Sequence, residues 1–170
     1  NSTFYGNHTT QAGSLGGAIY VFAAGSQAGE RLINNCTFSG SSAPGGGATL
    51  LTDSNEITIS NTIINDVPGS SNCMWNSGNG GAIVSGGYNI DSGNSCGLSG
   101  QGQVGDLEST DPLLDVAGPQ LNGDTIPSIL LSGGSPALNA VPAASCLTST
   151  DQRGVARPQG GSCDIGAIEQ

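Results

Sequence analysis

The chain has 170 residues, the length of about one domain, and carries 3 Lys and Arg residues against 13 Asp and Glu, a formal net charge of −10. A nucleic-acid groove needs clustered cations to neutralise phosphates, so this composition excludes one, and it disfavours an anionic membrane surface for the same reason. Charged residues make up only 9% of the chain and glycine supplies 29 residues, which predicts a folded all-β protein and excludes a helical bundle. No apolar run reaches the ~18 residues of a membrane-spanning helix, so we expect no direct membrane insertion.

Two short motifs alternate along residues 1–96, one beginning with asparagine and the other being the triplet Gly-Gly-Ala. In chain order they begin at Asn1, Gly16, Asn35, Gly46, Asn61 and Gly80. The short apolar runs between them are separated by Gly, Ser and Asn, which punctuate strands rather than helices. A unit of roughly 30 residues with about three short strands is typical of one rung of a parallel β-helix, and the repeats predict about three rungs. An antiparallel sandwich with glycine-rich strands is the alternative.

In a parallel β-helix, equivalent residues of successive rungs lie above one another at the ordinary strand spacing of about 4.8 Å. One predicted inward column consists of Ser2, Cys36 and Thr62, and the other of Phe4, Phe38 and Ile64. At the turn before them, we expect a stacked ladder of amides from Asn1, Asn35 and Asn61.

The five cysteines lack the paired Cys-x-x-Cys spacing of a zinc site, and in this acidic, lysine-free chain they predict disulfides and an oxidising compartment. We expect a disulfide from Cys73 to Cys96 that ties an apparent insertion at 67–79 to the end of the last rung. A second disulfide, from Cys146 to Cys163, would staple the C-terminal part. Cys36 lies in an inward column, so we expect a free buried thiol there.

Beyond Cys96 the repeat stops and proline becomes frequent. Because an exposed terminal rung is an open sheet edge that needs covering, residues 97–170 are predicted to form an irregular C-terminal cap over the repeats of residues 1–96. The chain opens at Asn1 directly in a strand motif, so we expect these to be the C-terminal rungs of a longer solenoid, or a partner chain to cover the first rung.

The C-terminal part carries motifs of a known family. They are the stretch 150–158 with Asp-Gln-Arg-Gly, the stretch 163–169 with Cys-Asp-Ile-Gly-Ala, and the stretches 111–114, 135–138 and 86–90. Together with the upstream repeats they resemble the choice-of-anchor Q domain, which ends bacterial surface proteins with right-handed parallel β-helix, pectate-lyase-like repeats. The resemblance implies a right-handed β-helix, export and surface display, and it supplies no enzymatic activity or catalytic residues.

Acidic residues of the repeats do not recur at matched positions, where stacking would bring carboxylates together for glycoside hydrolysis or Ca²⁺-assisted lyase chemistry. The charged residues concerned are Arg31, Asp53, Glu56, Asp66 and Asp91, and we expect them on solvated turns. His8, the only histidine, is expected in a turn. A second acidic set lacks the spacing of an EF-hand, so we predict no cofactor and keep a Ca²⁺ site as the alternative. It consists of Asp106, Glu108, Asp111, Asp115 and Asp124.

Two arginines lie among carboxylates in the C-terminal motifs. Because guanidinium groups form forked hydrogen bonds with carboxylates, we expect an ion-pair clamp that holds the last strand, in preference to a catalytic cluster. Its members are Asp151, Arg153, Arg157, Asp164 and Glu169. The predicted contact surface consists of Trp75, the only tryptophan, and Tyr88; we favour packing of the inserted loop there over a sugar-stacking platform.

These observations predict a non-catalytic module that is secreted or displayed on a bacterial cell surface, adhesin-like, with a structural, adhesion or assembly role. Its expected partners are other protein subunits or surface polysaccharide, contacted end to end or side on. One alternative is a polysaccharide-active, lyase- or hydrolase-like β-helix protein with its cleft on rungs outside this chain. Another is an accessory subunit of a larger extracellular or periplasmic complex. Matched acids on neighbouring rungs would favour the enzyme.

Overall fold

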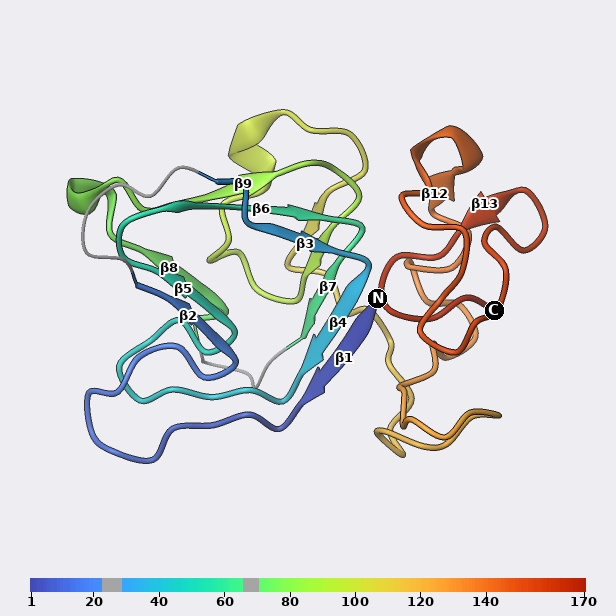
Figure 1. Ribbon diagram of the computed structural model, residues 1–170, viewed down its shortest axis with the longest axis horizontal. Helices are drawn as coiled ribbons and strands as arrows, with labels where there is room; N and C mark the ends of the chain where they lie inside the picture. Colours follow the sequence, from blue (N-terminus) through green and yellow to red (C-terminus); the bar gives the residue numbers. More distant parts are fainter. Residues whose placement is uncertain (23–28, 66–70) are drawn as a thin grey trace.

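The computed structural model describes residues 1–22, 29–65 and 71–170 (Figure 1). Most of its strands belong to three parallel sheets. The first sheet consists of β1 (Ser2–Tyr5), β4 (Cys36–Ser39), β7 (Ile63–Asn65), β10 (Ile90–Asp91) and β11 (Leu107–Glu108). The second consists of β2 (Ile19–Val21), β5 (Leu50–Thr52) and β8 (Cys73–Trp75), and the third of β3 (Leu32–Asn34), β6 (Glu56–Ser60) and β9 (Ala82–Ser85).

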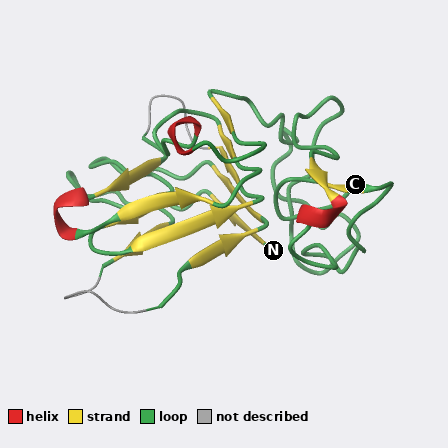
Figure 2. Cartoon of the chain, turned by 90° about the horizontal axis from the view of Figure 1, so that it is seen from above, coloured by secondary structure: helices red, strands yellow, loops and turns green. Residues whose placement is uncertain are grey.

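The rest of the regular structure is short. An antiparallel pair joins β12 (Val141–Pro142) to β13 (Ser162–Cys163). Three short 3-10 helices are η1 (Ser77–Asn79), η2 (Ser99–Gln101) and η3 (Ala143–Ser145), and the described part of the chain contains no α-helix (Figure 2). None of its helices is long and apolar enough to cross a membrane.

Each strand from β1 to β7 pairs with the strand three places later, so the chain visits the three sheets in turn and then returns to the first. This strand-rich, parallel arrangement is the one expected of the all-β chain, and it excludes the antiparallel sandwich for these strands. The first sheet also extends past the predicted boundary at residue 96, because β11 pairs with β10.

The inner core contains the two predicted columns. Phe4, Phe38 and Ile64 are in register across β1, β4 and β7, and the rings of Phe4 and Phe38 stack with centroids 4.5 Å apart. In the second column, Ser2 lies opposite Cys36, whose N–H donates to Thr62 Oγ1 at 3.3 Å. Both columns are therefore aligned. Phe38 and Ile64 are fully buried and Cys36 and Thr62 are buried, but Ser2, on the edge strand β1, is exposed.

The expected insertion covers residues 67–79, of which 67–70 lie outside the described residues. For residues 71–79 the expectation is wrong. Cys73–Trp75 is β8, the regular third strand of the second sheet, in register with β5. The error came from the Gly-Gly-Ala triplets: those at 16–18 and 46–48 precede strands of the second sheet, but the triplet at 80–82 leads into β9 of the third sheet. An added Cβ would overlap the Ala48 carbonyl oxygen at Gly17 and would lie 2.6 Å from the Thr52 carbonyl oxygen at Gly81. The triplet therefore marks a close approach of two backbones, which occurs at more than one corner.

The expected amide ladder is also wrong. Asn35 and Asn61 lie at the predicted turn with φ of 52° and 50°, a left-handed conformation that asparagine tolerates. However, the Asn61 amide donates to the Ser145 carbonyl oxygen at 3.1 Å and the Asn1 amide donates to that of Thr150 at 2.7 Å, while the buried Asn35 amide has no hydrogen-bond partner. The C-terminal part offers carbonyl oxygens at this corner, and two of the amides pair with them instead of with each other.

The part of the predicted cap that follows β11 lies beside the first sheet (Figures 1 and 2). Ala167 N–H donates to Thr37 Oγ1 at 2.9 Å and Gly166 N–H donates to the Asn61 carbonyl oxygen at 2.9 Å. A second core forms between the sheet and the C-terminal part, with Ile63 and Ile90 on the sheet side. The predicted cap is therefore corrected in part: residues 97–108 lie at the end of the repeats, and the remainder covers the side of the first sheet, because Ile63 and Ile90 on its outer face must be buried.

The two ends of the repeat region differ. After β10, Leu98 is fully buried in the inner core and its N–H donates to Glu108 Oε1 at 2.7 Å, so the segment after Cys96 helps to close that core. At the other end β1, β2 and β3 are edge strands, each paired on one side only among the described residues. Side chains of the C-terminal part reach β1, where Thr3 Oγ1 donates to Gln152 Oε1 at 2.7 Å, but they contact its face and do not pair with its edge.

Candidate functional site

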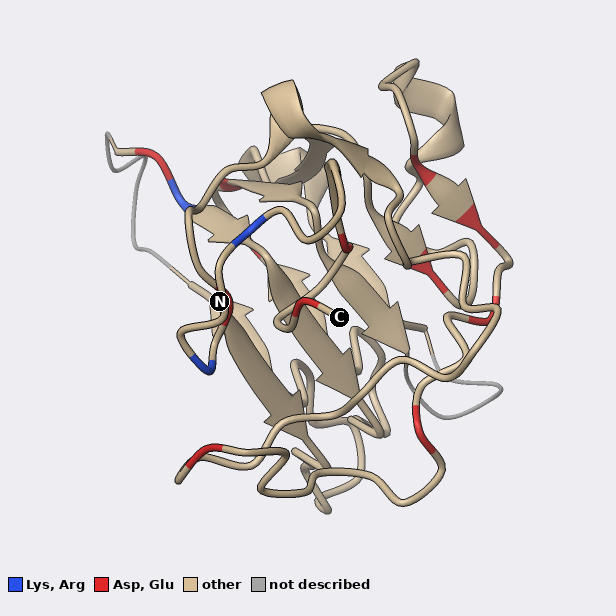
Figure 3. Cartoon of the chain, turned by 90° about the vertical axis from the view of Figure 1, so that its right-hand side faces the viewer, with Lys and Arg blue, Asp and Glu red and all other residues tan. Residues whose placement is uncertain are grey.

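Most carboxylates of the described chain are acceptors in the loops that shape it, and Figure 3 shows them distributed over separate loops and strand ends. Asp53 accepts from amide side chains, Asn76 Nδ2 at 2.9 Å and Asn79 Nδ2 at 3.3 Å. Nine others accept at least one backbone N–H: Asp91, Asp106, Glu108, Asp111, Asp115, Asp124, Asp151, Asp164 and Glu169. These bonds satisfy N–H groups at turns and corners, where no strand neighbour is present.

The structure brings one pair of acids to matched positions, which the sequence did not reveal. Asp91 in β10 lies directly opposite Glu108 in β11. The Asp91 side chain is fully buried and accepts from Asn72 Nδ2 at 2.5 Å, Gly93 N–H at 2.9 Å and Cys96 N–H at 3.0 Å. Burial opposes ionisation of Glu108, but hydrogen bonds from Ser99 and from backbone N–H groups of residues 97–99 lower its pKa. This pair lies at the last corner of the inner core, where both carboxylates accept hydrogen bonds from the loop at 93–99.

The remaining charged residues are not assembled into a centre. Glu56 is exposed on β6 opposite Ala82, and Arg31 donates to the Gly29 carbonyl oxygen at 2.9 Å. His8 Nδ1 lies 3.0 Å from the Gly6 carbonyl oxygen, and His8 forms an isolated parallel bridge with Ser42 instead of the expected turn. Asp66 lies outside the described residues. The residues that the structure describes, the acids considered for Ca²⁺ among them, contain no group of three His, Cys, Asp or Glu side chains able to hold a metal ion.

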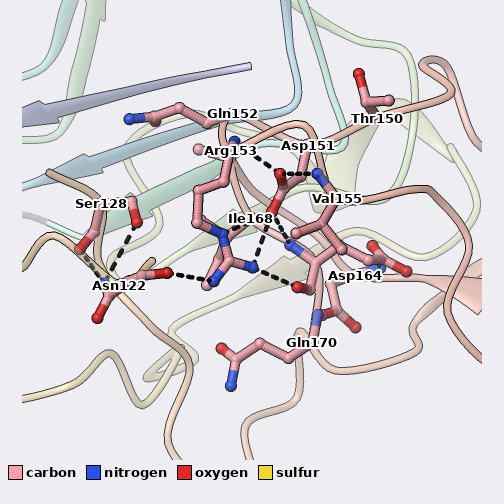
Figure 4. Close-up of polar contacts among 12 residues, drawn as sticks. Asn122, Ser128, Thr150, Asp151, Gln152, Arg153, Val155, Asp164, Ile168 and Gln170 are labelled. Carbon is pink, nitrogen blue, oxygen red and sulfur yellow. Dashed lines mark hydrogen bonds and ion pairs between the residues drawn. The ribbon is translucent and has the colours of Figure 1, made fainter. Parts of the chain in front are cut away.

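All five residues of the predicted clamp are joined by hydrogen bonds and ion pairs in the C-terminal part, and Figure 4 shows Asp151, Arg153 and Asp164 among them. Arg157, whose side chain is fully buried, pairs with Glu169 at 3.0 Å and also donates to the carbonyl oxygens of Asp164, Gly166 and Ile168 at 2.7–3.0 Å. Arg153 pairs with Asp151 at 2.9 Å and donates to the Glu169 carbonyl oxygen at 2.5 Å. The two guanidinium groups thus hold the final segment of the chain, residues 164–169, by its backbone; this segment follows the last strand β13 and is not itself a strand.

Hydrogen bonds and burial set the charge states in this clamp. Burial raises the pKa of Asp164, against hydrogen bonds from Asn139 and Gln170 N–H that favour its charged form. Burial also disfavours the charged form of Asp151, but the N–H groups of Glu169 and Val155 and the Arg153 side chain outweigh it and lower the pKa. Burial lowers the pKa of Arg157, and the charge of Glu169 opposes that effect. The carboxylates and the two terminal nitrogens of Arg157 find their partners within the chain, whereas the buried Arg157 Nε has none.

The structure separates the two residues of the predicted contact surface. Trp75 ends β8 in the second sheet, whereas Tyr88 packs in the second core, against the backbone of Gly105. Tyr88 has a φ of 55° at the corner that Asn35 and Asn61 occupy in the earlier strands. Trp75 is exposed, whereas Tyr88 is partly buried.

Trp75 instead lines a groove on the second sheet. The groove has a volume of about 350 Å³, and its lining consists of Leu15, Tyr20, Leu51, Thr52, Asp53, Met74, Trp75, Asn76 and Ser77. Tyr20, Leu51 and Met74 are in register across β2, β5 and β8. The misplaced third triplet hid the alignment of Met74 with Tyr20, and Trp75 is in register with Thr52 and Val21 one position further along the strands.

The disulfides join the pairs expected from the sequence, Cys73 to Cys96 and Cys146 to Cys163, and Cys36 is a buried free cysteine. Comparisons of the chain with protein-family models, with curated proteins and with solved structures found no match. The proposed function therefore rests on the geometry of the chain and on its sequence motifs.

Proposed function

We propose that this chain is a non-catalytic module of an extracellular or cell-surface protein, in which it has a structural, adhesion or assembly role. The observation that carries this proposal is the use of its carboxylates, which accept hydrogen bonds from turn, corner and clamp donors. General acid–base catalysis needs ionisable groups placed around one reacting bond with tuned pKa values. In the matched pair of acids, the buried Asp91 accepts three hydrogen bonds from within the chain.

The repeats are proposed to be rungs of a right-handed parallel β-helix. The pairing of β1, β4, β7 and β10 in one sheet, with strands of two other sheets between them in the chain, supports this architecture. Right-handedness is supported by the general rule that connections between parallel strands of one sheet are right-handed in almost all proteins. The stacked Phe4 and Phe38 rings are the side-chain arrangement such rungs produce.

A place on a bacterial cell surface or in the secreted fraction is proposed from two features. The two disulfides are compatible with an oxidising environment. The motifs at 150–158 and 163–169 that resemble the choice-of-anchor Q domain make up the clamp, so the resemblance lies in residues with a clear structural task. Other protein subunits or surface polysaccharide are the proposed partners.

The test of the non-catalytic role is incubation of the purified chain, with Ca²⁺, against panels of pectin, alginate and hyaluronan. We expect no new reducing ends and no unsaturated products. Products that disappear in Asp91→Asn or Glu108→Gln, but persist in Glu56→Gln as the exposed control, would overturn the proposal in favour of an enzyme.

A further inference from the structure

The groove on the second sheet combines exposed aromatic surface with fixed hydrogen-bonding groups. Tyr20 is 46% and Trp75 39% exposed, on the two outer strands of a three-stranded sheet. Two strand spacings separate β2 from β8, which is about 9–10 Å. Leu51 on the central strand β5 and Met74 on β8 are in register with Tyr20, and Trp75 follows Met74 on β8. Asp53 and Asn76 line the same groove.

The positions of these side chains are set by the fold. The Cys73–Cys96 disulfide joins β8 to the segment that contains Gly97, and a Cβ at Gly97 would lie 3.4 Å from Trp75 Cη2. The indole therefore rests against this backbone. Met74 packs so closely on Gly46 that a Cβ there would overlap its methyl group. Tyr20 contacts Phe22 edge to face, with centroids 6.2 Å apart.

The polar end of the groove is held in place as well. Asp53 accepts from the amide groups of both Asn76 and Asn79, and these bonds hold its carboxylate still while leaving acceptor positions on its oxygens. Asn76 N–H donates to the Thr52 carbonyl oxygen at 3.0 Å, which anchors the loop to β5. A ligand would therefore meet fixed acceptors beside an aromatic ring and pay little ordering cost.

We propose that this groove binds a short segment of a neutral polysaccharide. A pyranose ring has C–H faces that pack on the negative face of an aromatic ring and hydroxyl groups at its edge that donate to a carboxylate. Asp53 and the net charge of −10 disfavour an anionic glycan. A proline-rich peptide is the competing occupant, but its recognition does not call for a carboxylate held at the end of the groove. The inference deepens the adhesion role of the proposed function and rests on it.

Trp75, the single tryptophan, reports directly on the groove. We would titrate the purified chain with neutral tetrasaccharides of glucose, mannose, xylose and N-acetylglucosamine, and follow Trp75 emission and the heat of binding. At least one of them should give a saturable blue shift, because a stacked sugar removes water from the indole. Tetragalacturonate and a proline-rich peptide serve as anionic and peptide probes.

Three variants define the site. Trp75→Ala and Asp53→Asn should each weaken binding by about 10-fold, the change that loss of one stacking contact or one charged hydrogen bond produces. Tyr5→Ala, which removes an exposed aromatic ring on the first sheet, should leave the affinity unchanged. Trp75→Phe should restore most of the affinity lost in Trp75→Ala, which separates loss of the contact from loss of the fold.

The proposal is overturned if no neutral tetrasaccharide binds saturably, if tetragalacturonate or the peptide binds more tightly, or if Tyr5→Ala weakens binding as much as Trp75→Ala. Reducing ends are measured in the same samples. Their appearance would contradict the non-catalytic role and leave the sugar groove standing, whereas absence of binding would contradict the groove alone.

Discussion

Replacement of Arg157 by methionine tests the clamp most directly. The substitution removes a fully buried guanidinium that pairs with Glu169 and donates to three carbonyl oxygens of residues 164–168. Loss of one partner of a buried ion pair costs about 3–5 kcal/mol, because the other charge stays buried without compensation. We expect the local free energy of unfolding of the C-terminal part to fall by this amount, because the carbonyl oxygens that lose their donor lie there.

Hydrogen exchange of peptides covering 150–170 measures this loss locally, and urea unfolding followed by Trp75 emission reports on the repeats. A loss of about 3 kcal/mol corresponds to a fall in protection of more than 100-fold. Arg157→Lys should give a smaller but clear loss, since one ammonium group cannot replace the planar fork. Arg31→Met is the matched control, because this partly exposed arginine should change stability by no more than about 0.5 kcal/mol. Equal protection in Arg157→Met and Arg31→Met would refute the clamp.

Three further predictions concern the thiol, the pH dependence and the contact between the two parts of the chain. Cys36 should be inert to a thiol reagent in the native protein and react after unfolding, and a disulfide to Cys36 in a non-reducing peptide map would contradict its assignment. Folding lowers the pKa of Asp151, so the stability that this carboxylate contributes is complete above its ordinary pKa near 3.9 and is lost as the pH falls through the folded pKa. Urea unfolding between pH 2.5 and 6 should therefore show that stability falls less steeply with acid in Asp151→Asn than in the unchanged chain. The pKa of Asp164 is raised, so its contribution has the opposite sign and Asp164→Asn should make the acid loss steeper. Gly166→Ala should lower the thermal midpoint more than Gly161→Ala. Both glycines have a φ near 110°, but only at Gly166 would the new Cβ lie 2.7 Å from Thr37 Oγ1 in β4. Equal shifts would mean that this contact does not hold the two parts of the chain together.

Local patterns of the sequence were sufficient to predict which residues line the inner core. Phe4, Phe38 and Ile64 could be aligned because each follows a turn asparagine by the same three residues, and parallel strands stack equivalent positions. The same alignment placed Cys36 inside, which left the other cysteines to pair. The clamp residues were found because two arginines close to carboxylates in a chain with few charges have few other partners.

Only the tertiary structure decided which faces meet. The Gly-Gly-Ala triplet records that two backbones come close, and since this occurs at corners of different sheets, the triplet at 80–82 led to the wrong strand. The C-terminal part covers the side of the first sheet because Ile63 and Ile90 make its outer face apolar, a consequence of a register that pairs residues 27 positions apart. Asp91 and Glu108 became neighbours, and Trp75 joined Tyr20 in one groove, through the same pairing of distant strands. A sequence pattern shows which way a side chain points within its strand, but the partner strand is chosen by burial of the whole surface, and that choice creates the site.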